Sequence, residues 1–166
     1  MGSSKVAVLM GSDSDWKIMQ ACAAQLTEFG VEADVQVMSA HRTPDDVVAY
    51  VKAAGQNDIA VFVAGAGMSA ALAGTIAAHT TLPVIGVPID SGFMNGMDAL
   101  LSTVQMPPGV AVAGMAVGKA GAVNAAIFAV QILALGDVAL QQKLDDFRKS
   151  LADKVREANR RLQSEI

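Results

Sequence analysis

Short runs of apolar residues, rich in valine and isoleucine, recur along the chain and alternate with longer segments of helical period. The runs are KVAVLM at 5–10, ADVQVM at 33–38, IAVFVA at 59–64, PVIGVP at 83–88 and VAVAGMAV at 110–117. Such runs are typical of strands that are buried on both faces. Strands that alternate with helices form a parallel sheet covered on both sides. The pattern therefore predicts an α/β fold, a three-layer α/β/α sandwich with a central parallel sheet.

Two helix boundaries are marked in the first third of the chain. Segment 15–29 carries apolar side chains at helical spacing, and Gly30 supplies the stop. The next helix begins at TPDD, with Thr43 as its cap, Pro44 at the first position and two acids in the first turn. Each helix therefore starts a few residues after a predicted strand ends.

The segment AGAVNAAIFAVQILAL at 120–135 has two strongly polar residues, Asn124 and Gln131, so a helix there is apolar on nearly every face. It is too short to cross a bilayer, which takes about 20 residues. The chain is 52% hydrophobic and 17% charged, and a single domain has too little interior for all of this apolar surface. We expect this helix to be buried between subunits of a homo-oligomer; a central helix in a monomer is the alternative.

The tail at 137–163 has a different character and is predicted to be one long amphipathic helix. Its apolar stripe consists of Val138, Leu144, Phe147, Leu151 and Val155. The stripe can pack on a neighbouring subunit or on its own domain. We expect one domain over 1–166, with an α/β core at 5–135 and the tail helix serving oligomerisation.

Charge and cysteine content exclude several classes of protein. Lys plus Arg number 12 and Asp plus Glu 16, for a net charge of -4, so no basic face for nucleic acid is expected. The N-terminus shows no secretory signal, and the single cysteine, Cys22, fits a reducing cytoplasm. With only His41, His79 and this cysteine, a zinc site lacks ligands, so we expect no metal and no membrane association.

Three loops follow the ends of predicted strands: GSDSDW at 11–16, SAHRTP at 39–44 and GAGMSAALAG at 65–74. Ligands of open parallel sheets bind beyond the carboxyl ends of the strands, near the point where strand order reverses. We therefore expect all three loops to open on the same edge and to form one site.

The first loop is suited to an anion. Gly11 allows close backbone approach, and Ser12 and Ser14 lie where the free N–H groups of a helix start favour negative charge. A phosphate would repel Asp15, so we assign this carboxylate to sugar hydroxyls. Capping of the helix by Ser14 or Asp13 is the alternative.

The second loop pairs a proton carrier with a cation. Ser39 and Arg42 can hold a phosphate, and His41 can give and take a proton near neutral pH. A surface or backbone-capping role is the alternative for a loop histidine.

The third loop contains the dinucleotide pattern G-x-G-x-x-A at Gly65, Gly67 and Ala70, with Asp90 about 20 residues further on. A nicotinamide-binding protein is therefore a remote alternative. The pattern follows the third strand and no second domain is available for a substrate. A phospho-receiver domain is disfavoured because no aspartate ends that strand, and an FMN site because aromatic residues make up only 4% of the chain.

Taken together, MGSDSDW, SAHRTP, AGAG, TTLPVIGVP, LLSTVQMPPG and GKAGAVNAA resemble the N5-carboxyaminoimidazole ribonucleotide mutase family of purine biosynthesis over about residues 5–147. The resemblance implies a flavodoxin-like α/β/α fold, an octamer, and a C-terminal helix that reaches a neighbour. It also implies an isomerase that needs no cofactor and moves a carboxyl group, as trapped carbon dioxide, from the exocyclic nitrogen to C4 of the imidazole ribonucleotide.

By this resemblance His41 is the general acid and base. The residues expected to bind the ribonucleotide are Gly11, Ser12, Ser14, Asp15, Ser39, Ala40, Arg42, Ala66, Gly67, Ser69 and Leu72. Since carbon dioxide must not escape, the segment at 91–101 is our candidate for a cover that excludes water.

The third loop departs from the family pattern. Most members read AGAGGAAHLPG where this chain reads AGAGMSAALAG, so Met68 replaces a glycine, Ala71 a histidine and Ala73 a proline. Related carboxylases that use carbon dioxide directly carry SAHK and GRSN motifs, whereas this chain has Arg42 and no GRSN. A mutase is favoured, and direct carboxylation of aminoimidazole ribonucleotide is the alternative that these replacements keep open.

Overall fold

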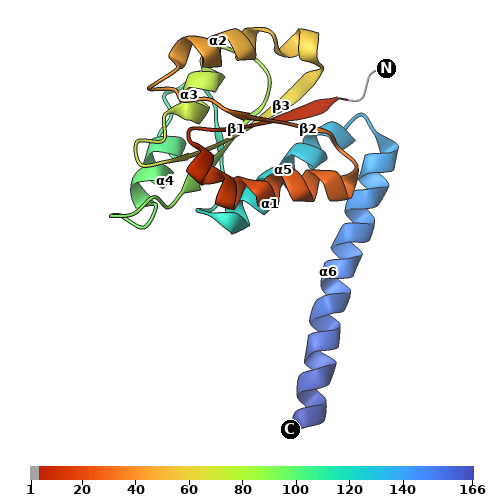
Figure 1. Cartoon of the computed structure of the whole chain (residues 1–166). Coiled ribbons are helices and arrows are strands. Elements are labelled where there is room, and N and C mark those ends of the chain that lie inside the picture. Colours follow the sequence, from red (N-terminus) through yellow and green to blue (C-terminus); the bar gives the residue numbers. More distant parts are fainter. Residues whose placement is uncertain (1–3) are drawn as a thin grey trace.

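The computed structural model describes residues 4–166, which form one α/β domain with a long helix at its C-terminal end (Figure 1). The strands are β1 (Lys5–Met10), β2 (Ala33–Val37), β3 (Ile59–Gly67), β4 (Val84–Ile89) and β5 (Ala113–Gly114). The α-helices are α1 (Trp16–Phe29), α2 (Pro44–Lys52), α3 (Leu72–Ala77), α4 (Met97–Val104), α5 (Lys119–Ala134) and α6 (Val138–Glu165). Two 3-10 turns, η1 (Asp13–Asp15) and η2 (Ala54–Asn57), join neighbouring elements.

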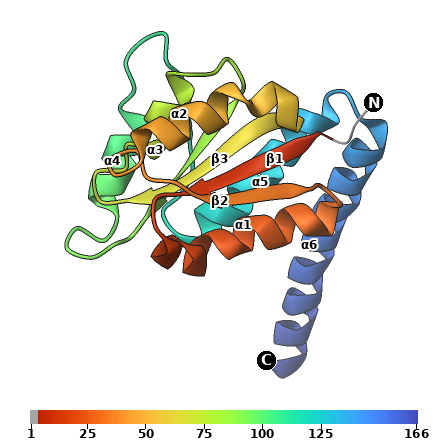
Figure 2. The same ribbon diagram turned by 45° about the horizontal axis from the view of Figure 1, so that its top comes forward.

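The five strands form one sheet in the order β2-β1-β3-β4-β5, and every pair is parallel. Alternate residues of β1 point to opposite faces: Val6 and Val8 pack with α1 and α5, whereas Ala7 and Leu9 pack with α2 and α3. Figure 2 shows α2 and α3 on one side of the sheet and α1 and α5 on the other. The predicted three-layer α/β/α sandwich is therefore confirmed, and the strand order is the flavodoxin-like one.

Both predicted helix boundaries lie where the sequence indicated. Gly30 ends α1 with φ 74°, a left-handed conformation that suits glycine, and its N–H donates to Leu26. Pro44 is the first residue of α2. Thr43 is the N-cap residue of α2, as predicted, but its side chain accepts no hydrogen bond from an N–H group of that helix. Instead its hydroxyl accepts a hydrogen bond from the N–H of Ser39 at 3.0 Å and stabilises the preceding loop.

The predicted strand at 110–117 is reduced to the two residues of β5. Met115 donates to the carbonyl of Gly86 at 2.9 Å, and Gly118 donates to that of Pro88 at the same distance. The chain therefore continues beside β4 after β5 has ended, but Pro88 of β4 has no N–H to donate to it. This missing hydrogen-bond donor on the neighbouring strand shortens β5.

The apolar helix predicted at 120–135 is α5, which lies against the sheet and α1 of its own chain. Its sheet-facing side consists of small residues, Ala122, Ala125, Ala126 and Ala129, all fully buried. Phe128, on another side of the helix, lines a largely apolar cavity of about 490 Å³ together with the loop at 109–111. One side of α5 is thus central within the domain, and burial of the rest between subunits stays a prediction.

The tail helix α6 starts at the predicted place and extends well away from the sheet (Figure 1). Asp137 caps it by accepting from the N–H groups of Ala139 and Leu140, at 2.9 and 3.1 Å. Leu144 is buried in the domain's core, and the ring of Phe147 lies 5.3 Å from that of Phe29 in edge-to-face geometry.

The apolar stripe of α6 is therefore divided between two environments. Leu144 and Phe147 pack on their own domain, the second of the two possibilities that the sequence left open. Val138, Leu151 and Val155 are exposed, with Val155 71% accessible. For Leu151 and Val155 the reason is length, since only the first turns of a helix of 28 residues can reach the core beside α1.

Replacing Leu144 with alanine should lower the free energy of unfolding by about 3 kcal/mol, because it leaves a cavity where α6 meets the core. Urea denaturation followed by circular dichroism measures this loss. Gln141→Ala, at an exposed position one turn earlier in α6, is the matched control and should change stability by less than about 0.5 kcal/mol. Equal effects of the two substitutions would mean that α6 is not anchored through Leu144.

Candidate functional site

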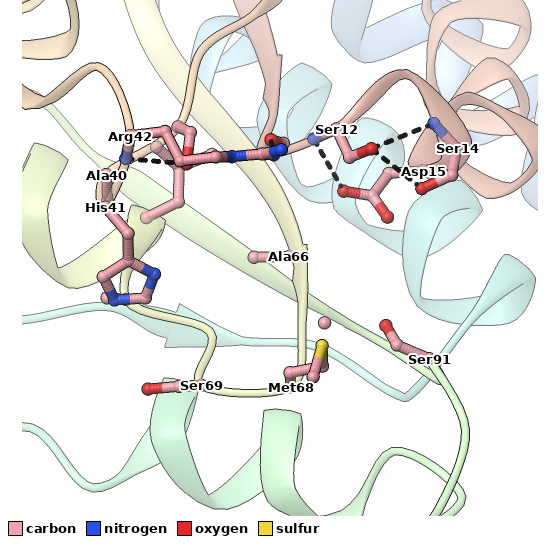
Figure 3. A pocket seen from close by; sticks show the side chains of 15 residues that line it. Ser12, Ser14, Asp15, Ala40, His41, Arg42, Ala66, Met68, Ser69 and Ser91 are labelled. Carbon is pink, nitrogen blue, oxygen red and sulfur yellow. Dashed lines mark hydrogen bonds between the residues drawn. The ribbon is translucent and has the colours of Figure 1, made fainter.

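A cavity of about 640 Å³ opens at the carboxyl ends of the central strands, where β1 and β3 are neighbours and the strand order reverses. All twelve residues predicted for the site line it: Gly11, Ser12, Ser14, Asp15, Ser39, Ala40, His41, Arg42, Ala66, Gly67, Ser69 and Leu72. Met68, Ala71 and Ser91 complete the lining. The fold thus brings the three predicted loops together around one pocket (Figure 3).

The first loop forms a reciprocal capping box at the start of η1. The hydroxyl of Ser12 accepts from the N–H of Ser14 at 3.3 Å, and the carboxylate of Asp15 accepts from the N–H of Ser12 at 3.1 Å. Ser14 also donates its hydroxyl hydrogen to Ser12 at 2.9 Å. The cap is therefore Ser12, and neither Ser14 nor Asp13, the residues considered from sequence, has that position.

Asp15 is the least accessible charged residue of the pocket, with 8% of its surface exposed. Burial raises the pKa of this carboxyl above its usual range, while the hydrogen bond from Ser12 and the nearby charge of Arg42 act in the opposite direction. One oxygen is occupied by the N–H of Ser12. The carboxylate is thus held in one orientation at the pocket wall, where its other oxygen can accept from a ligand.

Arg42 connects the first and second loops. Its guanidinium donates to the carbonyl of Gly11 at 2.6 Å and to the hydroxyl of Ser39 at 3.3 Å. The same hydroxyl accepts from the backbone N–H of Arg42 at 3.2 Å. A cation held at two points beside the η1 turn, whose amides also favour negative charge, makes this end of the pocket suited to a phosphate.

His41 extends from the second loop between Arg42 and Ser69 (Figure 3). Neither ring nitrogen forms a hydrogen bond with any other residue in the described part of the chain, 4–166, and the side chain is exposed. Both nitrogens are therefore available to a ligand. The second histidine, His79, lies outside the pocket just after α3, where its Nδ1 is 2.8 Å from the carbonyl of Thr75 in that helix.

The third loop is constrained at two adjacent positions. A Cβ on Gly67 would overlap the hydroxyl of Ser91 and would lie 3.1 Å from the carbonyl of Ile89, so only glycine fits there. Met68 has φ 55°, in the left-handed region, and its side chain is 66% exposed at the pocket. An L-residue in this conformation costs roughly 1–2 kcal/mol. The backbone of this loop is thus fixed by a close contact and carries strain.

Ser91 was not among the residues predicted to bind a ligand, although it begins the segment predicted as a cover. Its hydroxyl donates weakly to Ile89 at 3.4 Å and faces the pocket beside Gly67. It follows β4, so the rule that ligands bind beyond strand ends could have found it. Among residues 91–101, Ser91 is the one that lines the pocket, and Phe93 is fully exposed. The segment does not cover the pocket in this structure.

Within residues 4–166 no group of three or more histidine, cysteine, aspartate or glutamate side chains is arranged to hold a metal ion. Over the same residues, no helix has both the length and the apolar character needed to span a bilayer.

A family model described as AIR carboxylase matches residues 5–154. The chain belongs to this family. The N5-carboxyaminoimidazole ribonucleotide mutase of Bacillus subtilis strain 168 is 50% identical over 95% of this chain and 97% of its own length. The mutase of the same name from Escherichia coli K12 is 49% identical, with coverage of 93% and 91%. The crystal structure of Treponema denticola PurE superposes with a TM-score of 0.87 at 30% identity, covering 96% of this chain and 98% of that one.

These comparisons confirm the family resemblance drawn from the loop motifs. The glycine pattern of the third loop has an explanation in packing. Gly65 abuts Met19 of α1, where a Cβ would lie 2.5 Å from the sulfur, and Gly67 abuts Ser91. Both glycines thus have a packing role in this structure, so their spacing alone is no reason to propose a nicotinamide cofactor.

Replacing Asp15 with asparagine should raise the urea midpoint at pH 7. Folding raises the pKa of this carboxyl, so its ionised form is the less stable one in the folded chain. That cost is present above the folded-state pKa and disappears as the pH falls below the usual carboxyl range. The advantage of Asp15→Asn should therefore shrink toward pH 3, which urea titrations at several pH values can measure.

Asp13→Asn, two residues earlier and exposed, is the matched control and should change the urea midpoint at pH 7 very little, as surface substitutions usually do. A wild-type protein that is more stable than Asp15→Asn at pH 7 would contradict this account of the carboxyl.

Proposed function

We propose that this protein is an N5-carboxyaminoimidazole ribonucleotide mutase of purine biosynthesis, which converts its substrate to 4-carboxy-5-aminoimidazole ribonucleotide. The observation that carries the proposal is the convergence of Ser12, Asp15, His41 and Arg42 on one pocket in a chain 49% identical to a named mutase. The pocket offers a cation, a carboxylate and a proton carrier, and these match the phosphate, the ribose and the reacting base of such a substrate.

The phosphate binds at the Arg42 end of the pocket, where the guanidinium already bonds to Ser39 and Gly11. A fixed guanidinium loses little conformational entropy when a phosphate joins it. The ribose hydroxyls donate to the free oxygen of Asp15, whose other oxygen is held by Ser12. The base then lies toward Ala66 and Gly67, within reach of the imidazole of His41.

His41 serves as the single acid and base of the reaction. The bond between the exocyclic nitrogen and the carboxyl carbon breaks, its electron pair stays on nitrogen, and protonated His41 supplies the proton. Ring carbon C4 then attacks the released carbon dioxide, and the hydrogen on C4 passes to the now neutral imidazole. The residue returns to its starting state, so a histidine without a fixed protein partner is well suited to both steps.

Direct carboxylation of aminoimidazole ribonucleotide by carbon dioxide is the second candidate. It is favoured by the description of the matching family as AIR carboxylase and by Ala71, which replaces a histidine of the mutase pattern. The same pocket could bind that ribonucleotide, since both substrates carry the same ribose phosphate.

We further propose that the protein works in the cytoplasm as a homo-oligomer, an octamer by the family resemblance. Free, buried Cys22 supports the location. Apolar residues left exposed on α6 and α4, among them Leu151, Val155, Leu101 and Val104, support contacts between subunits. Closure of the segment at 91–101 over the pocket is proposed to accompany binding, since only Ser91 of it lines the pocket in this structure.

The purified protein should convert N5-carboxyaminoimidazole ribonucleotide to the C4-carboxylated product without ATP or added bicarbonate, as followed by ultraviolet absorbance. A parallel reaction contains aminoimidazole ribonucleotide and bicarbonate. His41→Asn should abolish turnover in the active reaction while calorimetric binding of the ribonucleotide persists, because asparagine cannot carry the proton. Activity in the second reaction alone would establish the carboxylase instead, and substantial turnover by His41→Asn would remove His41 as the acid and base.

Replacing Arg42 with alanine should weaken ribonucleotide binding by about 2 kcal/mol, the cost of removing a charged hydrogen-bond partner. Arg42→Lys, which keeps the charge but loses the fork to Gly11 and Ser39, should recover only part of this affinity. Isothermal calorimetry with the His41→Asn background avoids turnover during the measurement. Equal affinities for the lysine and arginine proteins would show that charge alone, without the fork, binds the phosphate.

A further inference from the structure

The pocket contains one serine hydroxyl without a partner among the described residues, that of Ser69. Five serines line the cavity: Ser12, Ser14, Ser39, Ser69 and Ser91. Three of them donate the hydroxyl hydrogen to another protein group, and a fourth, Ser39, accepts two hydrogen bonds from Arg42. Ser69 forms no side-chain hydrogen bond within residues 4–166, and it is exposed. Its hydroxyl is therefore available to a ligand.

Ser69 is also a departure from the family pattern. Where most members read AGAGGAAHLPG, this chain reads AGAGMSAALAG, so Ser69 replaces an alanine and, two residues later, Ala71 replaces a histidine. Both positions line the pocket. This wall has thus lost an imidazole and gained a hydroxyl, and each of these groups can donate a hydrogen bond. The two replacements together keep one donor at the wall.

The backbone of the third loop holds Ser69 at the pocket. The carbonyl of Ser69 accepts from the N–H of Ala71 at 2.7 Å, which closes a tight turn just before α3. On its other side Met68 has a left-handed backbone, with φ 55°. Figure 3 shows Ser69 below His41 and across the pocket from Ser12. The hydroxyl is thus on the side of the acid and base, away from the capping box.

A ribonucleotide with a carboxyl group brings two anions to a pocket whose described lining has one arginine and no lysine. In the proposed binding mode the phosphate uses Arg42, and His41 must exchange protons with the base. The carboxylate therefore needs a neutral donor close to the base, which lies toward Ala66 and Gly67. Ser69 is suited to this, because a hydroxyl donates to a carboxylate in a charge-assisted hydrogen bond without competing for the proton that His41 carries.

We propose that Ser69 donates a hydrogen bond to the carboxyl group of the bound ribonucleotide, in place of the histidine that the family pattern has at position 71. The inference rests on the proposed function. The exocyclic nitrogen is attached to the ring carbon beside C4, so the carboxyl group lies at the same edge of the base before and after its transfer. Ser69 thereby makes the pocket prefer a carboxylated ribonucleotide to an uncarboxylated one, and it takes no part in proton transfer.

Two ligands that differ by the carboxyl group alone test this preference: 4-carboxy-5-aminoimidazole ribonucleotide and aminoimidazole ribonucleotide. Their affinities are measured by isothermal calorimetry in the His41→Asn background, which prevents turnover. Ser69→Ala should weaken binding of the carboxylated ligand about tenfold, through the loss of one hydrogen bond to a charged group. The affinity for aminoimidazole ribonucleotide should change by less than about twofold, since the residue is exposed and its hydroxyl supports no other part of the described chain.

Three further variants separate the hydroxyl from the bulk of the side chains in this loop. Ser69→Thr keeps the hydroxyl and should keep the preference for the carboxylated ligand. Adding Ala71→His to Ser69→Ala restores both residues of the family pattern and should recover the lost affinity. Adding Ala71→Leu instead gives a large side chain without a hydrogen-bond donor, and it should recover none.

The outcomes distinguish the role of Ser69 from the proposed function on which it rests. If neither ribonucleotide binds before Ser69 is changed, the proposed function itself is overturned. If both bind and the loss caused by Ser69→Ala is confined to the carboxylated ligand, the role of Ser69 is supported. Equal effects on the two ligands, whether a loss or no change, overturn that role alone, and so does a protein with Ser69→Ala and Ala71→His that recovers no affinity.

Discussion

The parallel pairing of β1 with β3 at the centre of the sheet is the constraint on which the rest of the site depends. Met10 pairs with Gly65, and Gly11 donates its N–H to the carbonyl of Gly65 at 3.3 Å, so the first loop begins beside the last residues of β3, which ends at Gly67. Because β2 lies on the other side of β1, the chain leaves these strands toward opposite edges and opens a crevice between them. Shifting that register by one residue would turn the apolar side chains of β1 to the wrong face and separate the first and third loops.

The loops around this crevice are stabilised chiefly by one another. The guanidinium of Arg42 donates to the carbonyl of Gly11, a residue 31 positions earlier. The hydroxyl of Thr43 accepts from the N–H of Ser39 instead of from an N–H of its own helix. Within the first loop, the hydroxyl of Ser12 and the carboxylate of Asp15 each accept a hydrogen bond from a backbone N–H of the same turn. The groups that we propose for nucleotide binding are therefore already oriented, which reduces the entropy lost on binding. This arrangement has a cost, because burial raises the pKa of the Asp15 carboxyl group.

The third loop differs in kind, since close packing and backbone strain shape it along with its hydrogen bonds. Gly67 fits against Ser91 only because it has no side chain, and the residue after it has a left-handed backbone although it is a methionine. The loop presents the thioether of Met68 and the hydroxyl of Ser69 to the pocket, whereas the charged side chains of the lining come from the first and second loops.

The sequence by itself determined the first four strands, the end of α1, the start of α2 and the three loops that line the pocket, because period, glycine and proline positions are local properties. The tertiary structure decided what depends on residues distant in the chain. Pro88 shortened β5, Phe29 gave α6 its anchor, and β4 brought Ser91 beside Gly67. The cap at Ser12 and the conformation of Met68 were also settled by the fold, since several nearby residues could cap the turn and the sequence pattern does not encode φ. Local preferences fix the elements, whereas register and close contact fix the geometry of the site.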